Sequence, residues 1–150
     1  MKIRPITAAD IPGLLPLVEQ YWIFEDIAGF DGSRIARQLL RLCNDPRLGA
    51  GWIAEEKGRP VGYLLAVFIF SLEHLGLTAE IDEFFLLPRA RGHGAGSALL
   101  AATEAEATRR ECRNISLQLA RGNEAARDFY RRQGYSERSG FELLDKMLPQ

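Results

Sequence analysis

The longest apolar run of the chain extends from Val61 to Phe70. It is far too short to cross a bilayer as a helix, and it is typical of a strand that is buried on both faces of a sheet. The sequence Lys57–Pro60, which contains a glycine and a proline, predicts a turn immediately before it. We therefore expect two adjacent strands, Gly51–Glu56 and Val61–Ser71, near the centre of the fold.

Helical periodicity and end signals predict four helices. Thr7 is a suitable N-cap for the first helix, which would run to about Phe24 and be kinked or shortened at Pro16. Gly134 would stop the last helix. The four helices are expected at about Thr7–Phe24, Ser33–Asn44, Ala95–Glu111 and Asn123–Gln133.

Further strands are expected on both sides of these helices, at Met1–Ile6, Glu80–Leu87, Asn114–Ala120 and Phe141–Met147. The predicted order is therefore one strand, two helices, three strands, a helix, a strand, a helix and a last strand. This order indicates a mixed α/β (α+β) fold. Its first strands would pair mostly antiparallel, and a parallel pair would form across the third helix.

The composition narrows the class of protein. A chain of 150 residues with 47% hydrophobic and 26% charged residues suits one globular domain, residues 1–150. A net charge of −1 argues against nucleic acid and against an anionic membrane as partners. Cys43 and Cys112 have neither metal-ligand nor redox spacing. Because no signal peptide is recognisable at the start, we expect a cytoplasmic protein with reduced thiols.

A glycine-rich segment carries the clearest chemical signal. Arg91–Ser97 follows a predicted strand and opens a predicted helix, with glycines at three alternate positions. The first N–H groups of a helix attract anions, and glycines let phosphate oxygens approach the backbone. The segment lacks the lysine of a nucleotide P-loop and the third glycine of the dinucleotide fingerprint. It therefore predicts a site for a different pyrophosphate-bearing ligand.

The segment matches R-x-x-G-x-G, which resembles the acyl-CoA pyrophosphate loop of the GNAT superfamily of N-acyltransferases. A second segment, Asn123–Tyr135, resembles that superfamily's N-x-x-A-x-x-F-Y-x-x-x-G-[FY] signature. The two signatures stand in the family's order, with one predicted strand between them. The resemblance implies a mixed central sheet of six to seven strands flanked by about four helices. It also implies acetyl-CoA as co-substrate, no metal, and a homodimer.

The resemblance also implies roles for individual residues. Tyr130 would be the general acid that protonates the leaving thiolate, although an aromatic packing role is the alternative. Asn123 would contact the pantetheine arm or act only as a helix N-cap. The cofactor-binding residues would be Phe84, Phe85, Leu86, Arg91, Gly92, His93, Gly94, Ala95, Gly96, Ser97, Asn123, Ala126 and Tyr130.

Within the superfamily, Asp82–Leu86 resembles the Glu-Asp-Phe-Phe-Val run of the diamine (spermidine/spermine) N-acetyltransferases. Phe24 and Glu25 resemble the aromatic and acidic pair with which that group binds its polyamine. The match has two departures. The two strand acids stand in swapped order, and no acid matches that group's late polyamine contact. The resemblance implies a small-molecule amine acceptor bound by Phe24, Glu25 and Asp82.

An amine acceptor sets a requirement on the carboxylates of this strand. An alkyl ammonium ion has a pKa of about 10.4, so the neutral amine costs about 4.6 kcal/mol at pH 7. An acceptor carboxylate must therefore be desolvated or act through water. Strict alternation would place Asp82 and Glu83 on opposite faces, unless a β-bulge brings them together. We expect Asp82 to take the proton, with Glu83 as the second choice and solvated surface acids as the alternative.

Three functions are compatible with these features. The first is an acetyl-CoA-dependent N-acetyltransferase that acts on the primary amine of a small cationic acceptor. The second keeps the fold but acts on a protein N-terminus or an aminoglycoside. The third is an acyl-CoA-binding sensor without turnover. Tyr130 and the acidic strand favour an enzyme over a sensor, because a protein that only binds needs neither.

Overall fold

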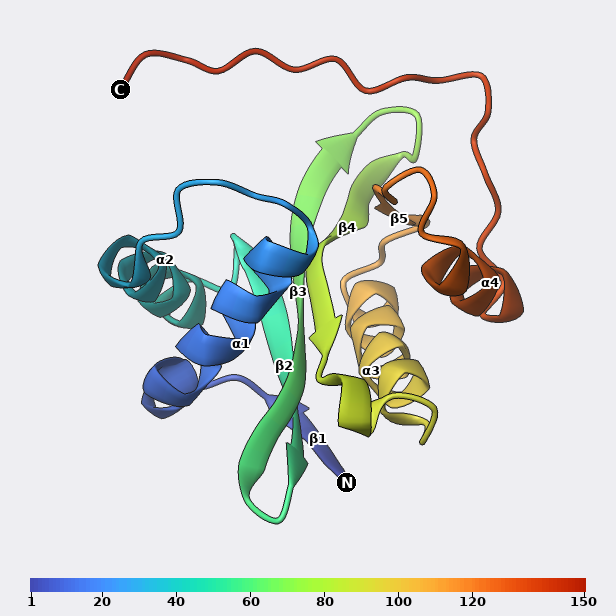
Figure 1. The fold of residues 1–150 in the computed structure, drawn as a ribbon. Coiled ribbons are helices and arrows are strands. Elements are labelled where there is room, and N and C mark those ends of the chain that lie inside the picture. The colour runs from blue at the N-terminus through green and yellow to red at the C-terminus, as the bar shows by residue number, and fades with distance from the viewer. The chain divides into compact units, whose positions relative to one another are not determined.

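A single five-stranded sheet forms the centre of the structure, a computed structural model that describes residues 1–150. The strands lie side by side in chain order. The first four pair antiparallel and the last pair is parallel (Figure 1). The expected central pair of strands is confirmed. The strands are β1 (Lys2–Pro5), β2 (Gly49–Glu56), β3 (Arg59–Ser71), β4 (Gly76–Leu86) and β5 (Ile115–Leu117).

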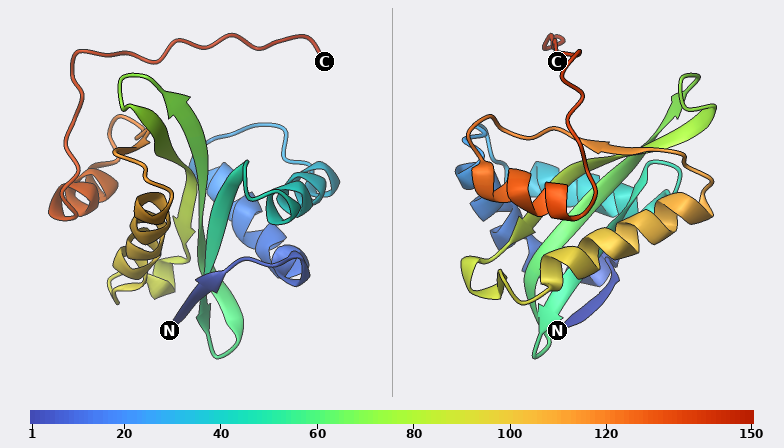
Figure 2. Two further views of the ribbon diagram at one scale, coloured as in Figure 1. Left: turned by 180° about the vertical axis from the view of Figure 1, so that it is seen from behind. Right: turned by 90° about the vertical axis from the view of Figure 1, so that its right-hand side faces the viewer.

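Three helices cover the two faces of this sheet. The helices α1 (Ile11–Phe24) and α2 (Gly32–Asn44) pack on one face, and α3 (Ala95–Arg109) packs on the other (Figures 1 and 2). Thr7 caps a short 3-10 helix, Ala8–Asp10, which leads into α1. Pro16 lies inside α1 and does not shorten it. No helix has both the length and the apolar character needed to span a membrane.

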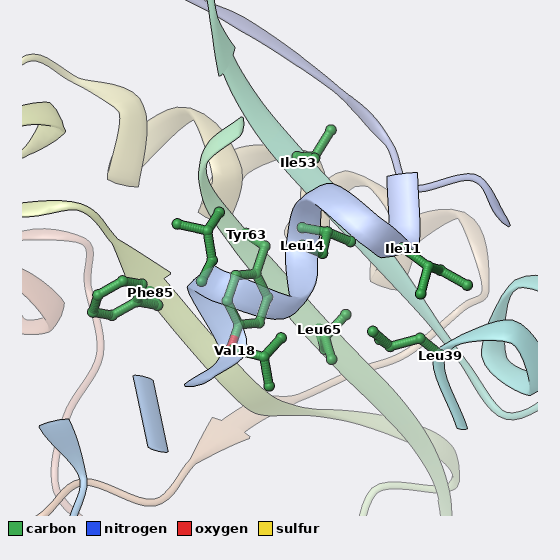
Figure 3. Close-up of a cluster of buried hydrophobic side chains, with 9 residues drawn as sticks. Ile11, Leu14, Val18, Leu39, Ile53, Tyr63, Leu65 and Phe85 are labelled. Atoms are coloured by element: carbon green, nitrogen blue, oxygen red, sulfur yellow. The ribbon is translucent and has the colours of Figure 1, made fainter. Parts of the chain in front are cut away.

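The core between the sheet and α1 is built from alternate residues of β3. Tyr63 and Leu65 of β3 contact a buried cluster that includes Leu14 and Val18 of α1 and Phe85 of β4 (Figure 3). Only 1% of the Tyr63 surface is exposed. A tyrosine buried to this degree needs a hydrogen-bond acceptor for its hydroxyl group.

The chain forms two compact units, residues 1–118 and residues 119–150. The first contains the sheet and α1–α3. In the second, α4 (Glu124–Arg132) starts at Asn123, whose side-chain oxygen accepts a hydrogen bond of 3.2 Å from the Ala126 N–H. The chain leaves this helix through Gly134, which has a φ of 92°. The expected fourth helix is thereby confirmed, with its cap and its stop.

The expectation of six to seven strands is wrong, because the sheet has five. The predicted last strand, Phe141–Met147, has no regular secondary structure, and its side chains are exposed. Two apolar residues, Leu143 and Leu144, stand next to each other there and break the alternation that one buried face requires. No sheet edge pairs with this segment, so its backbone forms no ladder. The strand β5 is also shorter than predicted.

Candidate functional site

An irregularity in β4 brings two acidic residues to the same place. Leu65 of β3 lies opposite Glu83, whereas the next residue, Ala66, lies opposite Ile81. Asp82 is therefore an extra residue on β4, as in a β-bulge. The bulge interrupts the alternation of side chains that would otherwise separate Asp82 from Glu83, and both line one groove. The structure thus contains the bulge that the pair of acids required.

The carboxylate of Glu83 is fixed by two donors, one buried and one half-buried. The Tyr63 hydroxyl donates to Glu83 Oε2 at 2.7 Å, and the Trp22 indole N–H donates to Oε1 at 2.9 Å. These donors come from β3 and α1, so the site is tied to the core. Each oxygen of a carboxylate has two acceptor positions. Glu83 can therefore keep both bonds and still accept a hydrogen bond from a ligand.

Burial changes the protonation of this cluster. Burial raises the pKa of Glu83, and the hydrogen bonds from Tyr63 and Trp22 oppose this change by stabilising the charged form. Burial and the neighbouring Glu83 carboxylate raise the pKa of Tyr63, so its hydroxyl remains a donor. Asp82 keeps one exposed side, but the protein around it removes enough water to raise its pKa as well. It receives no hydrogen bond.

The groove that contains these acids has a volume of about 640 Å³. Its walls come from α1, α2, the loop between them and the β3–β4 bulge. We call it the acceptor groove; Asp82 and Glu83 form one part of its lining, and polar side chains of α2 form another. Its volume lies in the range of small-molecule sites. A second groove of about 490 Å³, beside Cys43, contains none of the predicted site residues.

The predicted pyrophosphate loop has the geometry of an anion site. Gly92 and Gly94 have φ values of 76° and 83°, which side chains other than glycine adopt with strain. Gly94 is the N-cap of α3, and the first α-helical hydrogen bond runs from the Ala98 N–H to the Gly94 carbonyl. The N–H groups of Ala95 and Gly96 precede that bond, so they have no acceptor within the helix. His93 is exposed on this loop.

Arg91 has a different environment from the one expected. Its Nε donates to the Leu86 carbonyl at 2.9 Å, and its guanidinium group lies 5.6 Å and 5.7 Å from the ring centres of Phe24 and Phe85. Planar guanidinium groups stack well on aromatic rings, which accounts for this position. A contact between Arg91 and a phosphate stays a prediction. Phe24 and Glu25, the expected substrate-binding pair, do not line the acceptor groove.

The edge of β4 opens beyond the bulge. The ladder between β4 and β5 ends at Ile81, whereas β4 continues to Leu86. The Leu87 N–H donates to Val61 on the β3 side, so the Leu86 backbone points to the other edge. A ligand with amide groups can add to such an edge as an extra strand would. The pantetheine contacts expected at Phe84, Phe85 and Leu86 involve this part of β4.

The remaining predicted residues belong to the second unit. Asn123 caps α4 and thereby bonds Ala126, as described above. Tyr130 is half-buried, and its ring lies 5.2 Å from that of Phe129 and 5.4 Å from that of Tyr135. Both residues thus have a structural role within their own unit. Their contacts with acetyl-CoA stay predictions.

Trp22 and Tyr63 are site residues that the sequence prediction missed. Tyr63 is a polar exception inside a long apolar run, and Trp22 is close to the end of an apolar helix. A buried tyrosine or tryptophan requires an acceptor, and this requirement is a signal in the sequence. The sequence does not indicate which acid supplies the acceptor. No group of three or more His, Cys, Asp or Glu side chains is arranged to hold a metal ion.

Comparisons with known proteins identify the family of the chain. Residues 16–135 match the model of the Acetyltransferase (GNAT) family. The uncharacterized N-acetyltransferase YhfO of Bacillus subtilis is 30% identical over 145 residues, which cover 94% of this chain and 93% of that protein. The aminoalkylphosphonate N-acetyltransferase of Salmonella typhimurium is 36% identical over 87 residues. That match covers 57% of this chain and about half of the relative, 55%.

A solved structure extends the likeness to the whole chain. An integron cassette protein from the mobile metagenome of Cole Harbour Salt Marsh superposes with a TM-score of 0.85 and 28% sequence identity. The match covers 99% of this chain and 91% of that protein. The family model spans most of the chain, and the solved structure shares its fold. The chain therefore belongs to the GNAT family of acetyltransferases and is an acyl-CoA N-acetyltransferase.

Proposed function

We propose that the enzyme transfers an acetyl group from acetyl-CoA to the primary amine of a small acceptor bound in the acceptor groove. The observation that carries the proposal is the bulge at Asp82, which brings two carboxylates into one small-molecule groove. A cationic amine is the ligand that such a pair of acids would recognise. The aminoalkylphosphonate acetyltransferase relative, which is named for a small amine, supports the same class of acceptor.

The residues of the first unit fit the donor. In the proposal, the N–H groups at the start of α3 hold the pyrophosphate, because they are main-chain donors at the positive end of a helix. The edge of β4 at Leu86 receives the pantetheine arm. When bound, acetyl-CoA supplies a thioester carbon that the amine attacks, with the coenzyme A thiol as leaving group.

The two carboxylates have different roles in this proposal. Glu83 is held by two donors that favour its charged form, so it keeps its charge and binds the ammonium group. Asp82 has no donor, and burial brings its pKa closer to that of an amine. Asp82 Oδ therefore takes the proton that the ammonium group must lose before the nitrogen can attack.

Tyr130 completes the proposal as the general acid, on the strength of the signature Asn123–Tyr135. Its hydroxyl gives a proton to the leaving sulfur and regains one from the amine nitrogen as the amide forms. We do not extend the proposal to the diamine-binding group of the family. Two of the residues that carry that resemblance, Phe24 and Glu25, lie outside the acceptor groove.

Substitution of the two acids tests the proposed roles through the release of coenzyme A with a panel of small primary amines. Asp82→Asn should lower kcat by about 10²-fold or more, the usual range for a lost general base. Glu83→Gln should instead raise the KM of the amine by about ten-fold, because it removes a charged hydrogen bond. The control is Glu80→Gln, an acid of the same strand outside the groove.

Equal kinetic constants for wild type and both variants would contradict these roles. Turnover restricted to peptides or aminoglycosides would contradict a small acceptor. Binding of acetyl-CoA without acetylation of any amine would contradict the whole proposal.

The pH dependence of the amine KM tests the charge on Glu83. The hydrogen bond from Tyr63 lowers the pKa of Glu83, so Tyr63→Phe raises it. The KM rises as the pH falls through this pKa, because protonated Glu83 no longer attracts the ammonium ion. In Tyr63→Phe the rise should begin at higher pH, and in Trp22→Phe likewise. The control is Tyr21→Phe, which alters a ring that packs on Tyr63 and should leave the pH profile unchanged. Equal pH profiles in all variants would contradict the role of Glu83 in binding the ammonium group.

Removal of the Tyr130 hydroxyl tests the general acid. Tyr130→Phe should lower kcat by about 10²-fold and leave the affinity for acetyl-CoA within a few-fold, because protonation of the thiolate belongs to the chemical step. Tyr135→Phe is a matched control, since it removes a hydroxyl from the ring that packs on Tyr130. An unchanged kcat in Tyr130→Phe, or equal losses in both variants, would remove Tyr130 from this role.

A further inference from the structure

The acceptor groove has a basic wall as well as an acidic one. Arg34, Arg37 and Arg41 of α2 line the same groove as Asp82 and Glu83. Their spacing of three and four residues keeps them on neighbouring rows of one side of the helix. They extend over about 10 Å of the helix axis, at 1.5 Å per residue. One ligand of modest length can therefore contact the acids of β4 and the arginines of α2 together.

The guanidinium groups of these three arginines have no partner among the acids of the protein. None of them takes part in an ion pair or donates a side-chain hydrogen bond, whereas Arg4 and Arg110, for example, each bind a carboxylate. Two acids next to the ends of α2 have other partners. Asp31 accepts the Arg34 backbone N–H at 3.1 Å as the cap of α2. Asp45, which lies near Arg41, is paired with Arg47 at 2.9 Å.

The two walls make different demands on an acceptor. The acids favour an ammonium group, as in the proposed function, but three unpaired guanidinium groups repel any further positive charge. A polyamine would therefore meet attraction on one side of the groove and repulsion on the other. A molecule with an amine at one end and an oxyanion at the other matches both. Charge complementarity of this kind selects between acceptors that share the same reacting group.

We propose that Arg34, Arg37 and Arg41 bind an oxyanion of the acceptor, so that the substrate class is primary amines with a terminal carboxylate, phosphate or phosphonate. This inference rests on the proposed function, because it assigns the far end of the same substrate. The guanidinium fork binds carboxylate and phosphate oxygens in pairs, which gives direction as well as attraction. The oxyanion thus anchors the acceptor and directs its amine toward Asp82.

A set of acceptors with the same amine and different ends tests the inference. The probes are butylamine, putrescine, γ-aminobutyrate and aminopropylphosphonate, with ε-aminocaproate as a longer carboxylate. At least one oxyanion-bearing probe should exceed butylamine in kcat/KM by about ten-fold, the effect of a charge-assisted hydrogen bond, and putrescine should not. Comparison of γ-aminobutyrate with aminopropylphosphonate distinguishes a carboxylate from a phosphonate as the preferred oxyanion.

Substitution of the arginines assigns this preference to α2. The triple variant Arg34→Gln, Arg37→Gln, Arg41→Gln should lose the preference for the oxyanion, keep kcat/KM for butylamine within about two-fold and bind acetyl-CoA as wild type does. The single variants give the same measurement if the triple variant folds poorly. Arg59→Gln is the matched control, since this exposed arginine lies outside the groove. It should change nothing.

The outcomes separate this inference from the proposed function. Acetylation of butylamine with no advantage for any oxyanion, or with putrescine as the best probe, would overturn the inference alone. A loss of acetyl-CoA affinity in the triple variant would also overturn it, because the arginines would then serve the donor. If no amine is acetylated, the proposed function fails. In that case, calorimetry of γ-aminobutyrate binding in the presence of coenzyme A still tests the inference. Equal affinity of the wild type and the triple variant for γ-aminobutyrate, or no binding to either, would overturn it.

Discussion

The hydrogen bonds from Tyr63 and Trp22 to the Glu83 carboxylate join the central strand, the first helix and the bulged strand at one point. A buried hydroxyl or indole N–H without an acceptor is costly, and a desolvated carboxylate without donors is more so. The three groups satisfy one another, and the same contacts keep α1 against β3 and β4. The position of the acid in the groove therefore depends on the packing of the core. Site and fold are stabilised by the same interaction.

The bulge at Asp82 affects both the side chains and the outer edge of β4. It places Asp82 next to Glu83 in the acceptor groove, and the ladder with β5 ends one residue earlier, at Ile81. The side chains of β4 then serve the acceptor while its outer edge stays available to the donor, and the strand leads on into the loop before α3. In the proposed function, one irregular strand thus provides for both substrates. This arrangement suits direct transfer in a ternary complex, in which no protein side chain carries the acetyl group.

The sequence predicted most of the features that depend only on a few neighbouring residues. The glycines before α3, the cap at Asn123 and the long apolar strand were recognisable because each meets a requirement of its own few residues. The possibility of a bulge followed from two adjacent acids that a regular strand would separate. The partners of Glu83 could not be predicted in this way. Trp22 and Tyr63 lie 61 and 20 residues from it in the chain, and only the fold brings them together.

The error about the last strand has the same origin. Phe141–Met147 contains enough apolar residues for a strand, but a strand also needs an edge to pair with, which the sequence does not show. The sequence also did not indicate that the Arg91 guanidinium group lies beside the rings of Phe24 in α1 and Phe85 in β4, and its expected contact with a phosphate stays a prediction. In the sequence, the arginines of α2 indicate only the polar side of an amphipathic helix. The structure shows that they line the same groove as the acids of β4.

The central claim is that main-chain amides at the start of α3 hold the donor, and an NMR titration of the amide signals with acetyl-CoA tests it most directly. We predict large shifts at Ala95 and Gly96 in wild type, and an affinity lower by about ten-fold or more in Gly94→Val, whose side chain would cover these amides. Gly58→Val is the control. Gly58 has a φ of 74°, close to the 83° of Gly94, and neither position has an atom near an added Cβ. A folded Gly94→Val protein that binds acetyl-CoA as tightly as the control, or a wild type whose amides at 95 and 96 do not respond to bound acetyl-CoA, would contradict the account.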